Sequence, residues 1–298
     1  MGIESFVLEH EPQIRLGFFV GVLVLMALWE LAAPRRRPRC ARWLRWANNL
    51  SLVVLNTLVL RWLFPAAAVG MAVLAAERGW GLFNIHPVSP GLAILVSVLL
   101  MDFAIWLQHV MVHAVPLLWR LHRVHHADPD YDVTTGLRFH PLEILLSMGI
   151  KFATIALLGP PVVAVVAFEV ILNAMAMFNH GNVRLPGGLD RLLRLALVTP
   201  DMHRVHHSVE DDEANSNFGF NLSLWDRLFG TYRDQPRAGH EGMHIGIRGF
   251  ETPGQVVWLP GQLALPFMGR VTGYAINRRG FGVPGQQPAD RVNASDTE

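Results

Sequence analysis

Cysteine and charged residues are both scarce in this chain. The one cysteine, Cys40, excludes an internal disulfide and any metal site built on paired cysteines. Charged residues make up 16% of the 298 residues, against about 25% in an average soluble domain, while hydrophobic residues make up 51%. This imbalance predicts an integral membrane protein. The formal net charge of +1 is too small to indicate a nucleic-acid partner.

A secretory signal would begin with basic residues. The first twelve residues contain Glu4, Glu9 and Glu11 instead, so we expect no such signal. Long apolar segments follow instead. We expect membrane spans at residues 16–33, 50–73, 92–107, 142–158 and 162–178. Gly159-Pro160-Pro161 makes the last two spans a hairpin. The predicted fold is an all-α membrane bundle of about four to five spans with a cytosolic helical cap.

The second predicted span contains the polar residues Asn56 and Arg61 as well as Pro65. Its polar residues either face the protein interior or belong to a tilted or broken helix, and the sequence leaves both open. Six arginines between residues 35 and 45 place the first loop in the cytoplasm. Counting crossings from that loop puts residues 109–140 and 180–207 on the same cytosolic side. We expect the chain to lie in a bacterial inner membrane.

Histidine is concentrated in three short runs, HVMVH and two copies of HRVHH. Their members are His109, His113, His122, His125, His126, His203, His206 and His207. Helix positions i, i+3 and i+4 share one face, so we expect each run to point its imidazoles together as a pair or a trio. Eight or nine imidazoles exceed the four ligands of one zinc ion. The pattern predicts two metals with four or five imidazoles each, and it leaves iron, copper, zinc and nickel open.

These runs resemble the histidine motifs of the fatty acid hydroxylase/sterol desaturase superfamily. The similarity covers residues 48–250 and includes the stretches TGLRFHPLE, FNHGN, TPDMHRVHH and NFGFNLSLWDRLFGTY. It implies an integral-membrane di-iron enzyme that holds two non-haem Fe²⁺ ions and uses O₂ and electrons to hydroxylate or desaturate a lipid. The resemblance assigns metal ligation to the eight histidines above and to His180. Fatty acid 2-hydroxylases have a paired HxxxH at this point, whereas Asn182 and Val183 follow His180 here.

On this resemblance the chain divides into three segments. Residues 1–47 form an N-terminal span and a basic loop, residues 48–250 the catalytic domain, and residues 251–298 a membrane-surface segment with a flexible tail after Arg278. Residues 256–267 are apolar but contain Pro260, Gly261 and Pro266, so we expect them to lie on the membrane rather than cross it. The chain has no HPGG haem motif. We therefore expect a separate electron donor, a reductase with a ferredoxin or a cytochrome b5-like carrier.

Two residues are predicted to support catalysis, His140 and Asp201. His140 is a ligand, a proton donor or a structural residue, and Asp201 orients a ligand or forms a helix N-cap. Carboxylates in general are expected to orient ligand N–H groups. The candidates are Asp102, Asp128, Asp130, Asp132, Glu143 and Asp201.

Three rival functions are open to this sequence. His240 to His244 matches the HExxH signature of zinc proteases, but that site needs a helix and the surrounding glycines disfavour one. A divalent-metal transporter or a haem electron carrier is the non-enzymatic alternative. Such proteins place polar sites within their spans, where Asn56, Arg61 and Glu169 are the nearest candidates. We favour lipid hydroxylation over desaturation, and the sequence does not select among a sterol, an acyl chain, an alkylglycerol ether, a carotenoid and an aminolipid.

Overall fold

The computed structural model describes residues 2–270, and the flexible tail predicted after Arg278 lies outside them. Within this range no strand forms, and extended pairing is limited to isolated bridges such as Pro34 with Val183. The all-α prediction is confirmed. The helices are α1 (Ile3–Ala32), α2 (Arg42–Leu63), α3 (Ala67–Arg78), α4 (Leu82–Ile85), α5 (Pro90–Ala114), α6 (Pro116–His126), η1 (Thr135–Leu137), α7 (Pro141–Leu158), α8 (Val162–Asn179), α9 (Gly187–Leu193), α10 (Pro200–His206), α11 (Asp211–Ala214), α12 (Leu224–Leu228), α13 (Gly239–Gly242), α14 (Pro253–Val256), α15 (Leu259–Ala264) and η2 (Leu265–Phe267).

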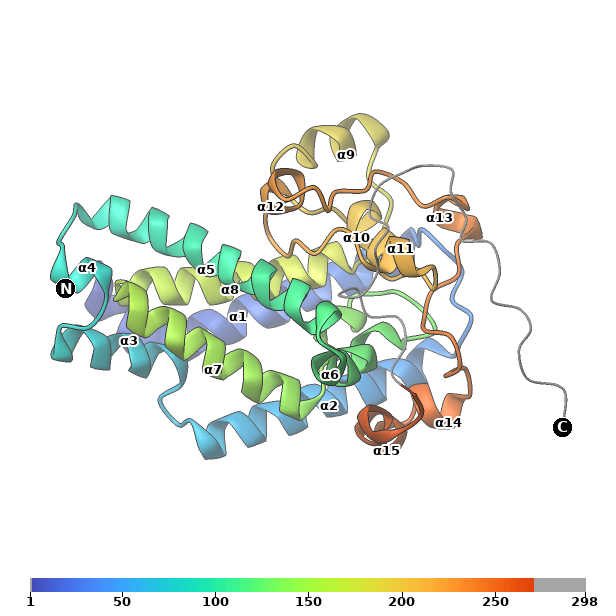
Figure 1. Ribbon diagram of the computed structural model, residues 1–298, viewed down its shortest axis with the longest axis horizontal. Coiled ribbons are helices and arrows are strands. Elements are labelled where there is room, and N and C mark those ends of the chain that lie inside the picture. The colour runs from blue at the N-terminus through green and yellow to red at the C-terminus, as the bar shows by residue number, and fades with distance from the viewer. Residues whose placement is uncertain (1, 271–298) are drawn as a thin grey trace, which may run out of the picture.

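Five helical segments of the described chain are long and apolar enough to cross a membrane, as expected (Figure 1). They are α1, the segment Arg42–Ile85, α5, α7 and α8. α7 and α8 have 18 residues each. At 1.5 Å per residue they are about 27 Å long, slightly less than the hydrocarbon core of a bilayer. The 30 residues of α1 bury only Met26 and Glu30, so this helix presents an apolar surface that fits lipid.

The second span is broken. α2 ends at Leu63, α3 begins at Ala67, and Pro65 lies between them. Proline lacks the backbone N–H that would continue the helix, and its ring clashes with the preceding turn. Asn56 is buried and donates from Nδ2 to the carbonyl of Phe139 at 2.8 Å, whereas Arg61 is exposed. Both possibilities left open by the sequence therefore apply. The helix is broken at Pro65, and Asn56 faces the protein interior.

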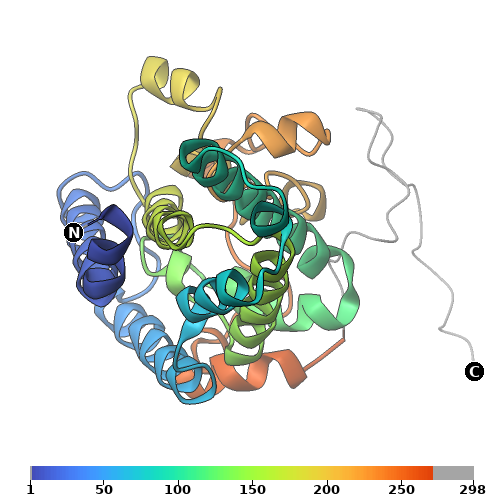
Figure 2. The same ribbon diagram turned by 90° about the vertical axis from the view of Figure 1, so that its left-hand side faces the viewer.

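The crossings bring the histidine-bearing segments to one end of the bundle. In Figure 1 this end carries α6, α10 and α11, and the opposite end carries α4 and the turn between α7 and α8. α8 packs against α1, α3 and α5, and it lies among the other long helices when the bundle is viewed along its axis (Figure 2). The turn is tight, because Gly159 has a φ of +60° and a Cβ on Gly81 would lie 2.1 Å from its nitrogen. The α7–α8 hairpin thus returns the chain to the histidine end.

A buried ion network joins the start of α2 to the segment that follows α6. Arg45 donates from Nε and Nη2 to the two carboxylate oxygens of Asp128 at 2.7 and 2.8 Å, and from Nη1 to Asp132 at 2.7 Å. All three residues are buried. Burial alone raises the pKa of Asp128, but the charges of Arg45 and Arg138 outweigh it and lower that pKa to about 2. The network therefore holds the carboxylates of Asp128 and Asp132 in place next to the first HRVHH run.

Glu30 makes a second connection at the same end. Its Oε1 accepts from the backbone N–H groups of Val133 and Asn182 at 2.8 and 2.7 Å. Val133 belongs to the segment after α6 and Asn182 to the segment after α8. The acidic residue at the end of the first span therefore fastens α1 to both loops next to the histidines.

Residues 256–267 hold no candidate span of the described chain, and their position on the membrane surface stays a prediction. Val256 ends α14, and residues 259–267 form α15 and η2. Val257 and Leu265 are buried in a cluster with Leu52 and Val124, whereas Trp258 and Phe267 remain exposed. This segment covers α2 and α6 at the histidine end.

Replacing Arg45 by leucine is expected to lower the free energy of unfolding by about 3–5 kcal/mol, because it leaves buried Asp128 and Asp132 without a cation. Arg248→Gln is the control, since its pair with Glu210 is exposed and should change stability by about 0–1 kcal/mol. Both variants can be compared by denaturant unfolding in detergent. Equal effects would show that the buried network does not stabilise the fold.

Candidate metal centre

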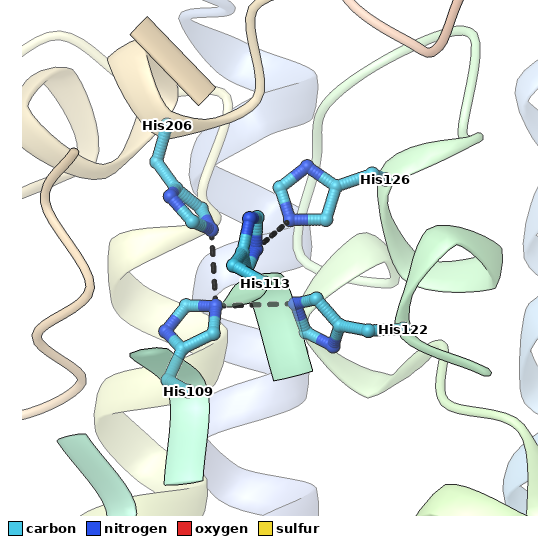
Figure 3. Close-up of side chains that lie close together, drawn as sticks. All are labelled: His109, His113, His122, His126 and His206. Carbon is cyan, nitrogen blue, oxygen red and sulfur yellow. Dashed lines mark hydrogen bonds between the residues drawn. The ribbon is translucent and has the colours of Figure 1, made fainter. Parts of the chain in front are cut away.

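Nine histidines converge in two groups at the end of the bundle. The first group contains His109, His113, His122, His126 and His206 (Figure 3). The second contains His125, His180, His203 and His207. Every one of these side chains is buried, and each ring of a group places one nitrogen within 4.8 Å of those of all the others. The structure thus brings together all nine of the histidines predicted as metal ligands.

Four helices supply these side chains. His109 and His113 occupy successive turns at the end of α5, and Pro116 begins α6 only two residues after α5 ends. His180 caps the C-terminal end of α8. The second HRVHH run covers the end of α10, whose first turn begins at Pro200. Each imidazole therefore lies at or near the C-terminal end of a helix, where the chain turns over the bundle.

Each HRVHH run divides between the two groups, which corrects the expectation that it would form one trio. In the first run His122 and His126 enter the first group and His125 enters the second. The second run divides the opposite way, with His206 in the first group and the i, i+4 pair His203 and His207 in the second. Adjacent helix positions point about 100° apart, so i+3 and i+4 reach different centres. Both runs thereby bridge the two groups.

Hydrogen bonds fix the orientation of three rings in the first group. The Nδ1–H groups of His109 and His206 donate to the carbonyl oxygens of Phe218 and Ser216, both at 2.7 Å. The Nδ1–H of His122 donates to Oε1 of Glu143 at 2.6 Å. A neutral imidazole that donates from Nδ1 has only a lone pair at Nε2. These three rings therefore direct lone pairs into the group.

The Nε2 atoms are very close together. His109 lies 3.1 Å from His122 and 3.0 Å from His206, and His113 lies 3.0 Å from His126, as the dashed lines in Figure 3 mark. Lone pairs at such separations repel one another. Two nitrogens that bind one metal at about 2.1 Å and at a right angle lie about 3.0 Å apart. The donor set and its spacing fit a metal cation.

The second group has the same geometry around His180. The Nδ1–H of His180 donates to the carbonyl of Ala176 at 2.7 Å, and its Nε2 lies 3.1 Å from that of His125 and 3.2 Å from that of His207. Gly136 permits this arrangement, because a Cβ there would lie 2.4 Å from the Ala176 oxygen and 3.0 Å from Nδ1 of His180. His125 stacks on Phe139 with ring centroids 4.5 Å apart.

Burial keeps these imidazoles neutral. It lowers the pKa of every clustered histidine outside the spans, and the pKa of His180 falls to about 3. The charges of neighbouring rings lower the pKa values of His125 and His207 further. A neutral ring is the form that binds a metal, so the electrostatics agree with the donor geometry.

The two residues predicted to support catalysis lie outside both groups. His140 is the N-cap of α7, where its Nδ1 accepts from the backbone N–H of Leu142 at 3.2 Å. Asp201 pairs with Arg204 and lies 3.5 Å from Nε of Arg35. The N-cap role considered for Asp201 was wrong, because Thr199 occupies that position of α10. Neither side chain contacts a clustered imidazole through a hydrogen bond.

Of the six carboxylates predicted to orient ligands, Glu143 alone accepts a hydrogen bond from a clustered histidine within residues 2–270. Asp128 and Asp132 bind Arg45, and Asp102 accepts from Nε1 of Trp225 at 2.8 Å. Asp130 accepts from the backbone N–H groups of residues 39 and 40. These four support the surrounding fold.

The prediction did not include the main-chain acceptors at Phe218, Ser216 and Ala176, since a carbonyl carries no side-chain signal. It also missed Asp226, which accepts from the N–H groups of Phe218 and Gly219 at 2.9 and 2.8 Å and so holds the acceptor loop. The available signal was the stretch NFGFNLSLWDRLFGTY, which carries part of the family resemblance and contains Phe218 and Asp226. The ring of Phe218 packs over the site, with its centroid 5.6 Å from that of His109.

The HExxH sequence does not form a protease site. α13 ends at Gly242, so His240 and His244 do not share a continuous helix. His240 is buried near Asp201, and Nδ1 of His244 lies 3.1 Å from a nitrogen of Arg39. Glu241 pairs with Arg35 at 2.7 Å. These contacts fasten the basic loop to the cap.

Replacing Glu143 by leucine removes the acceptor that orients His122. We expect the affinity of the first group for a divalent metal to fall about 10–100-fold. Metal titration of the metal-depleted protein measures this change. Glu241→Leu is the control, since that side chain is 76% exposed and pairs with Arg35 rather than with a clustered histidine. Unchanged affinity in Glu143→Leu would contradict the orienting role.

Comparison with known proteins gives the site a family. The family model for fatty acid hydroxylase matches residues 94–231. The chain is 31% identical over 174 residues to an ornithine lipid hydroxylase of Rhizobium tropici, which covers 58% of this chain and 50% of the relative. It is 32% identical over 150 residues to alkylglycerol monooxygenase of Homo sapiens, covering 50% of this chain and 33% of the relative.

Cholesterol 25-hydroxylase of Homo sapiens is 27% identical over 142 residues, which cover 47% of this chain and 51% of the relative. The chain therefore spans between a third and about half of the length of these relatives. No solved structure matches the chain. The resemblance inferred from the histidine runs is confirmed. Residues 94–231, which include all nine clustered histidines, match the family model for fatty acid hydroxylase.

Proposed function

We propose that this chain is a membrane-embedded di-iron oxygenase that hydroxylates a lipid with O₂ and externally supplied electrons. The observation that carries the proposal is the pair of buried histidine groups, which lie within a region that matches the fatty acid hydroxylase family model. The relatives named above are hydroxylases and a monooxygenase, which favours hydroxylation over desaturation.

The donor set supports two redox-active metals. Five imidazoles exceed the four ligands usual for zinc, and neutral nitrogen ligands suit iron. When bound, Fe²⁺ ions supply the O₂ activation needed to oxidise an unreactive C–H bond. Hydroxylation inserts one oxygen atom into that bond and reduces the other to water, which consumes two electrons and two protons. A separate donor must deliver these electrons, and we propose a reductase with a ferredoxin or a cytochrome b5-like carrier.

The chain's own residues orient the ligands and exclude water. Glu143 and the carbonyls of Phe218 and Ser216 hold three imidazoles in the tautomer that binds metal. The ring of Phe218 covers the first group, and Phe139 covers His125 in the second. A dry site strengthens these electrostatic interactions and protects a reactive oxidant from side reactions.

The membrane end that carries the histidines determines where substrate and donor approach. The backbone N–H of Arg36 donates to Oδ1 of Asn182 at 2.9 Å, so the arginine-rich loop lies at the same end as His180. By the positive-inside rule this supports a cytoplasmic site in a bacterial inner membrane. A lipid would then enter from the cytoplasmic leaflet. The relatives' names indicate lipids with a polar end, such as an aminolipid, an alkylglycerol or a sterol.

The non-enzymatic alternatives are not favoured. A bis-histidine haem needs its two axial nitrogens on opposite faces of a macrocycle, and Nε2 atoms 3.0–3.2 Å apart leave no room for one. A transporter would use ionisable groups within its spans. Glu169, the candidate within α8, is already paired with Lys151 at 2.7 Å and Arg15 at 3.2 Å.

Metal analysis and lipid analysis together test the function. We expect about two iron ions per chain of purified protein. We also expect a hydroxylated lipid in cells that express the chain. His206→Ala and His203→Ala, one from each group, should lose metal and abolish the product. His244→Ala, which lies outside both groups, should retain both. Stoichiometric zinc with an unchanged lipid profile would refute the proposal.

A further inference from the structure

A cavity of about 150 Å³ lies directly beside the first histidine group. One wall is α6, through Trp119, Arg123 and His126, and the facing wall contains Val209 and Phe250. His126 belongs to both the cavity lining and the first group. The cavity therefore reaches a ligand of the candidate metal centre from outside.

Arg123 is the buried charge of this cavity. The residue is 2% exposed. Its Nη2 donates to the carbonyls of Leu265, at 2.6 Å, and Met268, and its Nη1 donates to the carbonyl of Arg270 at 3.3 Å. The guanidinium carbon lies 4.8 Å above the ring of Phe250. Within residues 2–270 no carboxylate lies in ion-pair range of Arg123, and its buried Nε has no hydrogen-bond partner. A buried cation without a nearby anion and a buried N–H without an acceptor both raise the free energy of the folded protein. This position therefore favours an anionic ligand.

The other charged lining residues differ from Arg123. Arg248 is 67% exposed and pairs with Glu210 at 2.8 Å. Asp211, in the first turn of α11, also lines the cavity and is partly exposed. Arg123 is thus the lining cation that is buried and lacks an anion in the described chain.

The volume limits what can bind. A cavity of about 150 Å³ in another protein holds one benzene molecule, so a space of this size accepts a small polar group and not a whole acyl chain. An apolar chain would instead follow the exposed apolar surface of the spans. Leu107 and Met111 on α5, next to the histidines, belong to that surface.

We propose that this cavity binds the anionic head group of the lipid substrate, a carboxylate or a phosphate, and that Arg123 recognises it. The proposal rests on the proposed function and narrows its substrate class to lipids with an anionic group. Binding there places the head group beside His126, so the carbons presented to the centre are those near the polar end of the lipid.

Paired probes test this recognition without requiring turnover. N-lauroylglycine and its methyl ester share the acyl chain and the amide, but the ester has a methyl group in place of the carboxylate charge. Dodecyl phosphate and dodecanol share the alkyl chain and differ by the phosphate group. Binding to the purified full-length chain in neutral nanodiscs is measured by calorimetry, with metal content determined in parallel. We expect the anionic member of at least one pair to bind about tenfold or more tightly, as charge-assisted hydrogen bonds do.

Arg123→Gln should reduce this preference to about twofold or less, because glutamine keeps an amide donor for the carbonyls but removes the charge. Arg120→Gln is the matched control. Arg120 lies one turn earlier on α6 and donates to the carbonyl of Pro266 at 3.0 Å, but it does not line the cavity. It should retain the full preference. Val209→Trp fills the cavity without changing its charge and should weaken binding of both members of the pair. It tests the cavity independently if Arg123→Gln does not fold.

An equal preference in Arg123→Gln and the unaltered chain, or an equal loss in Arg120→Gln, would overturn the proposal. Absence of any anionic preference in the unaltered chain would overturn it as well. Head-group preference without iron or lipid hydroxylation would retain this site and reject the proposed function. Bound iron and lipid hydroxylation without a preference for the anionic probe would retain the proposed function and reject this site.

Discussion

Neutral imidazoles that direct lone pairs at one another inside a protein repel unless a cation lies between them. Five imidazoles form one group here and four form the other, and hydrogen bonds from Nδ1 direct the lone pairs of His109, His122, His206 and His180. They come from α5, α6, α8 and α10, so four helices must arrive with the correct rotation about their axes. A shift of one residue turns a side chain by about 100° and would remove its ring from the group. The rest of the structure depends on satisfying this requirement.

The polar contacts around the groups serve that alignment. Arg45 fixes α2 to the segment after α6, and Glu30 fixes α1 to the loops after α6 and α8. Asp226 holds the loop whose carbonyls accept from the imidazoles. Each of these groups is buried and would be costly without its partner. Stability and ligand orientation therefore rely on the same hydrogen bonds, which connect a lipid-facing bundle to a polar cap.

The location of the site connects the fold to the proposed chemistry. The spans expose leucine and other apolar side chains to the bilayer, while the cap buries histidines, arginines and carboxylates within one end. A lipid is itself apolar along its chain and polar at its head. The cavity beside His126 contains the buried charge of Arg123. In the proposal above, this cavity receives the polar group of such a lipid and the acyl chain stays with the long apolar helices.

Local sequence determined the helical class, the candidate membrane spans and the identity of the clustered histidines. Apolar length and residue spacing along a helix do not depend on the packing partner. Tertiary structure decided how each HRVHH run divides between the two groups, because that depends on where α6 and α10 pack. It also decided that His140 caps α7 and that Asp201 pairs with Arg204. Main-chain acceptors such as Phe218 and the buried charge of Arg123 arise only when distant segments meet, so no local pattern encodes them.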